Sequence, residues 1–350
     1  MNERNKKNRH HYVPKFYLKN FTNNNKYICT FVVEKNKYIR NGSIRTMAQS
    51  HNLYGDTNEV EDKLCEIEMK ASKIIKDIIQ TKTLPTKLSL EFLQLMQFIV
   101  ISDLRTLKLN EIVSEQQKRL KDSILSSING DLDKLSNQVK EILRFDKKEN
   151  SVLLLSMSSG LQYKLHDLEM CLISHNSRSR EFITTDVPIN KDNIFAKSLN
   201  GYSDGTGFSN LGFELFFPIT PKLCLFLYDP KIYEITNSNS MDVKINDKDI
   251  DKINKYFYLN SNSNLYFSEK ISEDYLKKHI LSYEKHSKNK ILEDSFRKHT
   301  NSKGQDSLYE FRLDSSQGKL ILPFIKMTEY AKTITVKPSA GFYQRSSTLL

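Results

Sequence analysis

The chain has 350 residues, of which 38% are hydrophobic and 27% are charged, and its formal net charge is +11 at pH 7. This composition excludes a fully disordered chain, because it supplies enough apolar side chains for a packed core. The positive charge favours anionic partners, nucleic acid above all, although a lysine-rich genome produces the same excess without any ligand.

Nothing in the sequence indicates secretion or a membrane span. The N-terminus lacks an apolar stretch of the signal-peptide kind, and the most apolar window, residues 88–101, is too short and too polar to cross a bilayer. The cysteines stand far apart without a CxxC pair, as expected of reduced thiols rather than a disulfide frame or zinc site. They are Cys29, Cys65, Cys171 and Cys224. We therefore expect a cytoplasmic protein without membrane attachment.

The first half of the chain predicts a hairpin followed by helices. Apolar and polar residues alternate over 26–42 around a Lys-Asn-Lys turn, which indicates a β-hairpin. Apolar residues recur at helical spacing from Val60 to Ile78, and residues 87–120 predict a second, central helix. Further helices are expected at 131–147 and 151–174.

The pattern changes after residue 176, where short strand-like runs alternate with prolines and glycines. The predicted fold is α+β, with an N-terminal β-hairpin, a central helical bundle (about 56–175) and a C-terminal mixed β-sheet region with helices (about 176–270). Residues 271–350 are expected to form a lysine-rich helical extension and tail that could bind a protein partner. No dinucleotide fingerprint or P-loop is present, so no nucleotide cofactor is predicted.

The first candidate site is the stretch "HHYVP", which begins at His10. A histidine can act as a general base or metal ligand near neutral pH, and adjacent side chains of an extended backbone point in different directions, so one of His10 and His11 would act. Alternatively, the neighbouring aromatic residues pack the N-terminus onto the body of the protein, and both histidines only form hydrogen bonds.

Two carboxylates and an arginine form the second candidate. Glu61 and Glu68 lie seven residues apart and so share one flank of the helix, where partly desolvated carboxylates require a partner. Arg105 continues the buried face of the next helix. We expect it to pair with Glu68 or Glu61 as a structural ion pair, and the alternative is that it contacts a substrate phosphate.

The third candidate is Asp186, which follows the apolar run "EFITT" and precedes Val187 and Pro188. A carboxylate at the end of a rigid strand suits a metal-dependent hydrolase. An aspartate in this position is equally suited to capping a turn.

Several blocks occur in a characteristic order: "HHYVPKFYLKNF", "NLYGD", "VEDKLCEIE", "FIVISDLRT", "EFITTDVPI", "FFPITPKLCL" and "INKYFYLNSNSNLYFSE". In this order they resemble the DUF4238 family, which is known by an HYVP motif and has no assigned function. The resemblance runs from about residue 9 to about residue 270. The resemblance strengthens the interpretation of the residues within its blocks as functionally important. These residues include His11, Tyr12, Pro14, Glu68, Arg105 and Asp186.

Two functions from different classes are consistent with these residues. The first is a metal-dependent hydrolase of nucleic acid or nucleotides, such as a toxin-like or phage-defence nuclease. His10 or His11, Arg105 and Asp186 would then be catalytic, with His11, Glu68 and Asp186 holding Mg²⁺ or Mn²⁺. The second is a non-catalytic subunit that binds nucleic acid or protein, in which the same residues form a buried structural network.

Overall fold

The computed structural model describes residues 9–335 and 344–345, with gaps at 23, 55–57, 128–130, 132, 134, 138–139, 141–143, 145, 200–204, 237–241, 283–298, 301–305 and 308–317. The described part is an α+β fold with an N-terminal hairpin, which confirms the predicted class.

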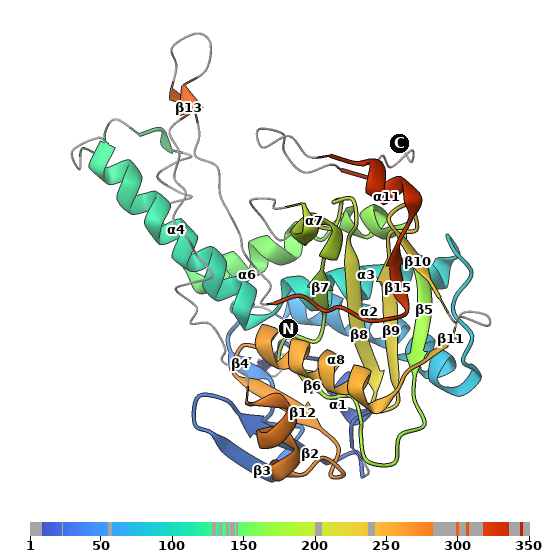
Figure 1. Cartoon of the computed structure of the whole chain (residues 1–350). Helices are drawn as coiled ribbons and strands as arrows, with labels where there is room; N and C mark the ends of the chain where they lie inside the picture. The colour runs from blue at the N-terminus through green and yellow to red at the C-terminus, as the bar shows by residue number, and fades with distance from the viewer. Residues whose placement is uncertain are drawn as a thin grey trace.

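A five-stranded sheet forms the centre of the described structure (Figure 1). Its strands, in spatial order, are β11 (Asp242–Lys244), β5 (Glu169–Ser174), β9 (Leu223–Tyr228), β8 (Glu214–Thr220) and β7 (Asn190–Asp192). The pair β11–β5 is parallel and the other pairs are antiparallel. Side chains alternate between two hydrophobic clusters, so Phe217 and Leu225 face one cluster while Phe216 and Phe226 face the other.

Helices cover both faces of this sheet. The helices α2 (Glu59–Thr81) and α3 (Leu90–Leu104) lie behind it in Figure 1, together with the short α1 (Lys15–Lys19). The helix α8 (Asp247–Asn260) crosses in front and packs Ile253 and Phe257 onto the second cluster. The helix α3 is buried nearly all round, as its apolar sequence predicts.

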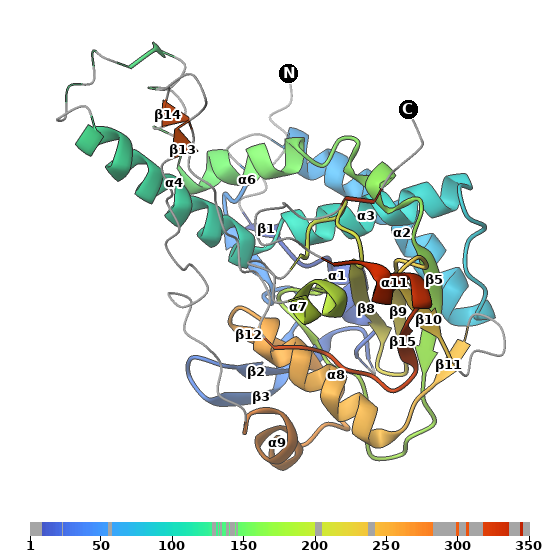
Figure 2. The ribbon, with the colours of Figure 1, turned by 45° about the horizontal axis from the view of Figure 1, so that its top comes forward.

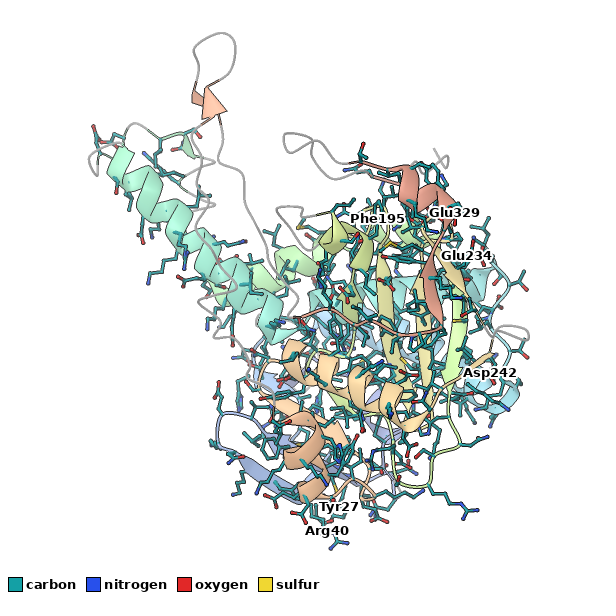
Figure 3. All side chains as sticks on the ribbon, in the orientation of Figure 1. Tyr27, Arg40, Phe195, Glu234, Asp242 and Glu329 are labelled. Carbon is teal, nitrogen blue, oxygen red and sulfur yellow. The ribbon has the colours of Figure 1, made fainter. Side chains whose placement is uncertain are left out.

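A second, four-stranded sheet joins the start of the chain to its later part. Its strands, in order, are β3 (Lys37–Ser43), β2 (Tyr27–Val32), β12 (Asn264–Phe267) and β6 (Thr184–Thr185). Figure 3 labels Tyr27 and Arg40 at its outer end, far from Phe195 and Glu329. A separate two-stranded ribbon pairs β1 (Arg9–His11) with β4 (Gln49–His51).

The predicted single helix over 87–120 is two helices, α3 and the projecting α4 (Leu107–Ser127). The break has a local cause: the hydroxyl of Thr106 donates to the Asp103 carbonyl at 3.0 Å and accepts from the Leu109 amide at 3.3 Å. It places Arg105 at the end of α3, where its side chain can turn toward α2.

The helix predicted over 151–174 is wrong in its second half. Helix α6 (Lys147–Ser156) and the 3₁₀ turn η2 (Leu161–Leu165) are followed by strand β5, because Leu172 and Ile173 are buried on opposite faces of the sheet. About half of the helix predicted at 131–147 lies outside the described residues.

Residues 320–334 of the C-terminal part pack against the same fold. Leu320, Leu322 and Phe324 enter the second cluster, and β15 (Ile325–Met327) pairs with β10 (Tyr233–Ile235). Arg345 is buried and binds Asp167 at 2.9 Å. More than half of the lysine-rich extension expected at 271–350 lies outside the described residues.

Short elements complete the description. They are α7 (Ile194–Ser198), α9 (Glu273–Tyr275), the π-helical turn η3 (Leu276–Ile280), β13 (His299–Thr300), β14 (Asp306–Ser307) and α11 (Glu329–Thr333). Among the helices that the structure describes, none combines the length and the apolar character that a bilayer crossing requires.

Candidate active site

The β1–β4 ribbon sends the two predicted histidines to opposite sides. His10 pairs with Ser50 and His11 with Gln49, so successive side chains alternate between the ribbon's faces. After the ribbon, Pro14 begins α1 with an extended backbone (φ −60°, ψ 139°). Tyr12, Tyr17 and Phe21 are buried, so the aromatic residues of this segment anchor the start of the chain to the core.

His10 is completely buried and supports Tyr54. Its Nδ1 accepts a hydrogen bond from the Tyr54 backbone amide at 3.1 Å. The two rings also stack, with centroids 5.2 Å apart and planes inclined by 9°. His10 therefore holds Tyr54 in place and has one ring nitrogen already occupied.

Arg105 and Glu68 form the ion pair that the sequence predicts. Nη1 of Arg105 donates to Oε1 of Glu68 at 2.7 Å. The arginine side chain is 1% exposed and the glutamate side chain 25% exposed, so the pair reaches solvent only on the glutamate side. The other edge of the guanidinium is different: Nε and Nη2 are buried and have no hydrogen-bond partner among the described residues.

His11 presents a second unsatisfied atom. Its Nε2 is buried without a hydrogen-bond partner in the described structure. Burial, with the positive charges of Lys15 and Arg105, lowers the pKa of His11 to about 4, although backbone hydrogen bonds with Ile44 and Arg45 oppose the shift. At neutral pH the imidazole is therefore uncharged.

The Tyr54 hydroxyl is also buried; it makes no hydrogen bond of normal geometry, although Arg105 lies close enough for a weak hydrogen bond. Burial raises the pKa of Tyr54, the carboxylates of Glu61 and Glu68 add to the shift, and Arg105 opposes it. The hydroxyl thus lies among the charges of Arg105, Glu68 and Glu61 and stays protonated at neutral pH.

Several buried atoms on these elements have unmet hydrogen-bonding capacity. They are Nε and Nη2 of Arg105 and the hydroxyl of Tyr54, and Nε2 of His11 with Oε1 of Gln49 opposite it on the paired strand. Buried polar groups in folded proteins are almost always satisfied. A ligand that accepts hydrogen bonds would satisfy the arginine edge, and exposed Lys15 adds positive charge that acts on His11.

Asp186 has a different environment. Its two carboxylate oxygens accept hydrogen bonds from the amides of Asn262, Ser263 and Asn264 at 2.8, 2.6 and 2.9 Å. This arrangement fastens the turn between α8 and β12 to the end of β6. Asp186 also acts electrostatically on Tyr12, on the opposite face of the N-terminal segment from His11.

Of the predicted site residues, the structure brings Glu68 and Arg105 into contact, and His10 into contact with Tyr54. His11 and Glu61 are linked to this group only by electrostatic effects, of Arg105 on His11 and of Glu61 on Tyr54. It uses the carboxylate of Asp186 to hold a turn. In the described part of the chain no group of three or more His, Cys, Asp or Glu side chains is arranged to hold a metal ion.

Sequence reasoning missed three residues of the site: Lys15, Gln49 and Tyr54. Tyr54 belongs to the block "NLYGD", which supports the family resemblance, so a signal for it was available. Gln49 carries no sequence signal, because only strand register brings it opposite His11. Lys15 is one of many lysines, and only its position reveals its effect on His11.

Comparison with known proteins identifies the family of the chain. Residues 9–271 match the model of the family described as "Protein of unknown function (DUF4238)". The match covers most of the chain and includes every residue of the site, so the protein belongs to the DUF4238 family. No curated protein and no solved structure matches the chain.

Proposed function

We propose that this protein hydrolyses phosphodiester bonds in nucleic acid or nucleotides at the site formed by His11, Tyr54 and Arg105, as a toxin-like or phage-defence nuclease would. One observation carries the proposal: the Nε and Nη2 donors of Arg105 are buried without a hydrogen bond of normal geometry, and the charge of this arginine acts on both His11 and Tyr54. The Nε and Nη2 donors of a guanidinium match two oxygens of a phosphate, which they bind in a bidentate manner.

His11 is suited to the role of general base. When the ring proton lies on Nδ1, Nε2 carries a lone pair that can take a proton from water as the water oxygen attacks phosphorus. The P–O bond to the leaving oxygen then breaks, and that oxygen takes a proton from solvent. A bound phosphate would raise the pKa of His11 toward neutrality, because its negative charge stabilises the imidazolium.

Arg105 and Tyr54 stabilise the charge that develops on the phosphate. The guanidinium is held in place by Glu68, so it does not have to reorient during the reaction. The protonated hydroxyl of Tyr54 donates a hydrogen bond to a further oxygen. Because His10 fixes Tyr54 by a hydrogen bond and by stacking, His10 is a positioning residue in this scheme.

No step in this scheme passes through a metal ion. Of the predicted ligands, Asp186 is engaged with three amides and Glu68 with Arg105, so both carboxylates have other partners. That cleavage depends on Mg²⁺ or Mn²⁺ stays a prediction, which is tested by comparing the cleavage rate with each metal and with EDTA.

A non-catalytic role has one observation in its favour: the Arg105 side chain is only 1% exposed and already ion-paired. On this alternative, the residues form a buried network in a subunit that binds nucleic acid or protein. A network that only fixes the fold would, however, satisfy its members, because an unmet buried donor costs about 1–3 kcal/mol.

The test is a cleavage assay with the full-length protein. Single-stranded and double-stranded DNA, RNA, tRNA and bis(p-nitrophenyl) phosphate are incubated with EDTA, Mg²⁺ or Mn²⁺. We expect His11→Gln to lower the cleavage rate by about 10²–10⁴-fold and Arg105→Lys to lower it strongly as well. His279→Gln and Arg40→Lys, which lie outside the site, are the matched controls and should retain the rate.

Circular dichroism and thermal melting establish that each variant is folded. If the wild-type protein cleaves none of these substrates under any of the three conditions, or if folded His11→Gln cleaves at the wild-type rate, the proposed mechanism is wrong.

A further inference from the structure

A groove between α4 and α6 is lined by several basic side chains. It has a volume of about 550 Å³ and is lined by polar and charged side chains. The lining residues are Ser114, Gln117, Lys118, Lys121, Arg144, Asp146, Lys147 and Asn150.

The two helices present these residues for a clear local reason. On α4, Ser114, Gln117, Lys118 and Lys121 recur at spacings of three and four residues and so share one face. The amide group of Asn150 on α6 donates to Ser114 at 3.1 Å and to Gln117 at 2.8 Å. These hydrogen bonds join α6 to α4 within the groove, and cationic side chains are part of its lining.

The positive charge of the lysines in the groove is not neutralised by the groove's own carboxylate. Its carboxylate, Asp146, caps α6 by accepting from the amides of Lys148 at 2.7 Å and Glu149 at 3.0 Å, and these hydrogen bonds lower its pKa. Among the described residues, no carboxylate lies within salt-bridge distance of Lys118, Lys121 or Lys147. The lysines are exposed and available to an anionic ligand.

The groove also has a fixed relation to the candidate active site. Helix α4 begins at Leu107, two residues after Arg105, and its first turn lies near the β1–β4 ribbon in both views (Figures 1 and 2). At a rise of 1.5 Å per residue, Lys118 and Lys121 lie roughly 17–21 Å along α4 from its start. A rigid helix therefore links the unpaired guanidinium to the basic groove.

We infer that the groove between α4 and α6 binds the sugar–phosphate backbone of the nucleic acid whose phosphodiester reaches Arg105. This inference rests on the proposed function, because it assigns the substrate class to that site. A polynucleotide fits better than a lipid surface, since the lining offers cationic, amide and hydroxyl groups and no apolar side chain to enter a membrane.

The test measures binding apart from cleavage. A fluorescein-labelled 20-nucleotide RNA and the DNA of the same sequence are titrated at several salt concentrations with protein that carries His11→Gln, so that cleavage does not interfere. Replacing Lys118, Lys121 and Lys147 together by Gln should weaken binding at least tenfold. It should also reduce the slope of log K against log salt by about 0.7 for each lost contact to a single strand.

The matched control replaces Lys26, Lys35 and Lys37, three exposed lysines at or near the β2–β3 hairpin, by Gln and so removes the same charge elsewhere. Equal weakening in both triple variants would overturn the inference, because general charge would then explain the binding. Binding to phosphatidylserine vesicles without binding to either oligonucleotide would also overturn it.

Cleavage of bis(p-nitrophenyl) phosphate, which is too small to span the groove, separates this inference from the proposed function. The groove variant with His11 intact should hydrolyse it at the wild-type rate. Loss of oligonucleotide binding in the groove variant supports the inference even if no substrate is cleaved. Unchanged binding overturns it even if cleavage is observed.

Discussion

Arg105 donates Nη1 to Glu68 at 2.7 Å, while Nε and Nη2 on the opposite edge of the same guanidinium have no partner among the described residues. Glu68 therefore fixes the orientation of the arginine without using its bidentate edge. An arginine oriented in this way is prepared for an anion, because little side-chain entropy is left to lose on binding.

The first prediction concerns inorganic phosphate as the simplest anion for this edge. Phosphate should raise the melting temperature of the wild-type protein, by the equivalent of about 2.7 kcal/mol at a concentration 100 times its Kd. Arg105→Lys should lose most of this stabilisation, because an ammonium cannot bind two oxygens in parallel. Thermal melts in phosphate and in chloride of equal ionic strength provide the measurement. An equal phosphate effect in both proteins would place the bound anion elsewhere.

The second prediction concerns the pH dependence that His11 imposes. Its pKa is about 4 in the folded protein and near 6.5 in the unfolded chain, so the unfolded state binds the proton more readily. The stability that His11 contributes is complete above pH 6.5 and is lost as the pH falls toward 4. We expect the wild-type melting temperature to fall more steeply than that of His11→Gln over this range.

Proton NMR provides a direct check on the same group. The His11 resonances of the free protein should titrate near pH 4 and should move to a higher midpoint when phosphate is bound. A midpoint near 6.5 in the free protein would mean that His11 is not desolvated as the structure indicates.

Local patterns in the sequence predicted the fold class and an ion pair of Arg105 with Glu68 or Glu61, because burial of an arginine in an apolar helix requires a carboxylate. The structure forms the pair with Glu68. Local patterns could not predict that α3 and α4 are separate helices, since the break depends on the hydroxyl of Thr106 and not on a proline or glycine. They also assigned Leu172 to a helix, although pairing of β5 with the distant β9 makes it part of a strand.

The site itself depended on contacts between segments far apart in sequence. Periodicity indicated that His10 and His11 point in different directions, but only the fold shows that His10 supports Tyr54 while the charge of Arg105 acts on His11. The sequence left Asp186 open between a site carboxylate and a turn residue. Its three amide partners come from residues 262–264, which no local pattern connects to it.

The third prediction separates those two roles for Asp186. If the carboxylate serves to hold the turn, Asp186→Asn should destabilise the protein by about 3 kcal/mol, because hydrogen bonds to a charged group are weakened. The folded variant should keep the phosphate affinity and the metal dependence of the wild type. Urea denaturation and a metal titration of the cleavage rate test the two statements. A large change in the metal concentration required would instead support the metal-ligand role.

The fourth prediction concerns a buried carboxylate outside the site. Glu214 is fully buried and lies opposite Asp192 in the β7–β8 pair. Burial and the charge of Asp192 raise the pKa of Glu214 to about 8, while the Ile194 amide, Tyr233 and Lys197 oppose the shift. The folded protein therefore keeps a proton on Glu214 that the unfolded chain releases near pH 4.5.

The stability that protonated Glu214 contributes is complete below pH 4.5 and is lost as the pH rises toward 8. Glu214→Gln is neutral at every pH and should avoid this loss, so its melting temperature should rise relative to the wild type between pH 5 and pH 9. Glu234→Gln, an exposed glutamate on β10, is the matched control and should follow the wild type throughout. Melting curves of the three proteins between pH 5 and pH 9 provide the measurement. A constant difference between Glu214→Gln and the wild type would mean that Glu214 is already ionised in the folded protein at pH 5.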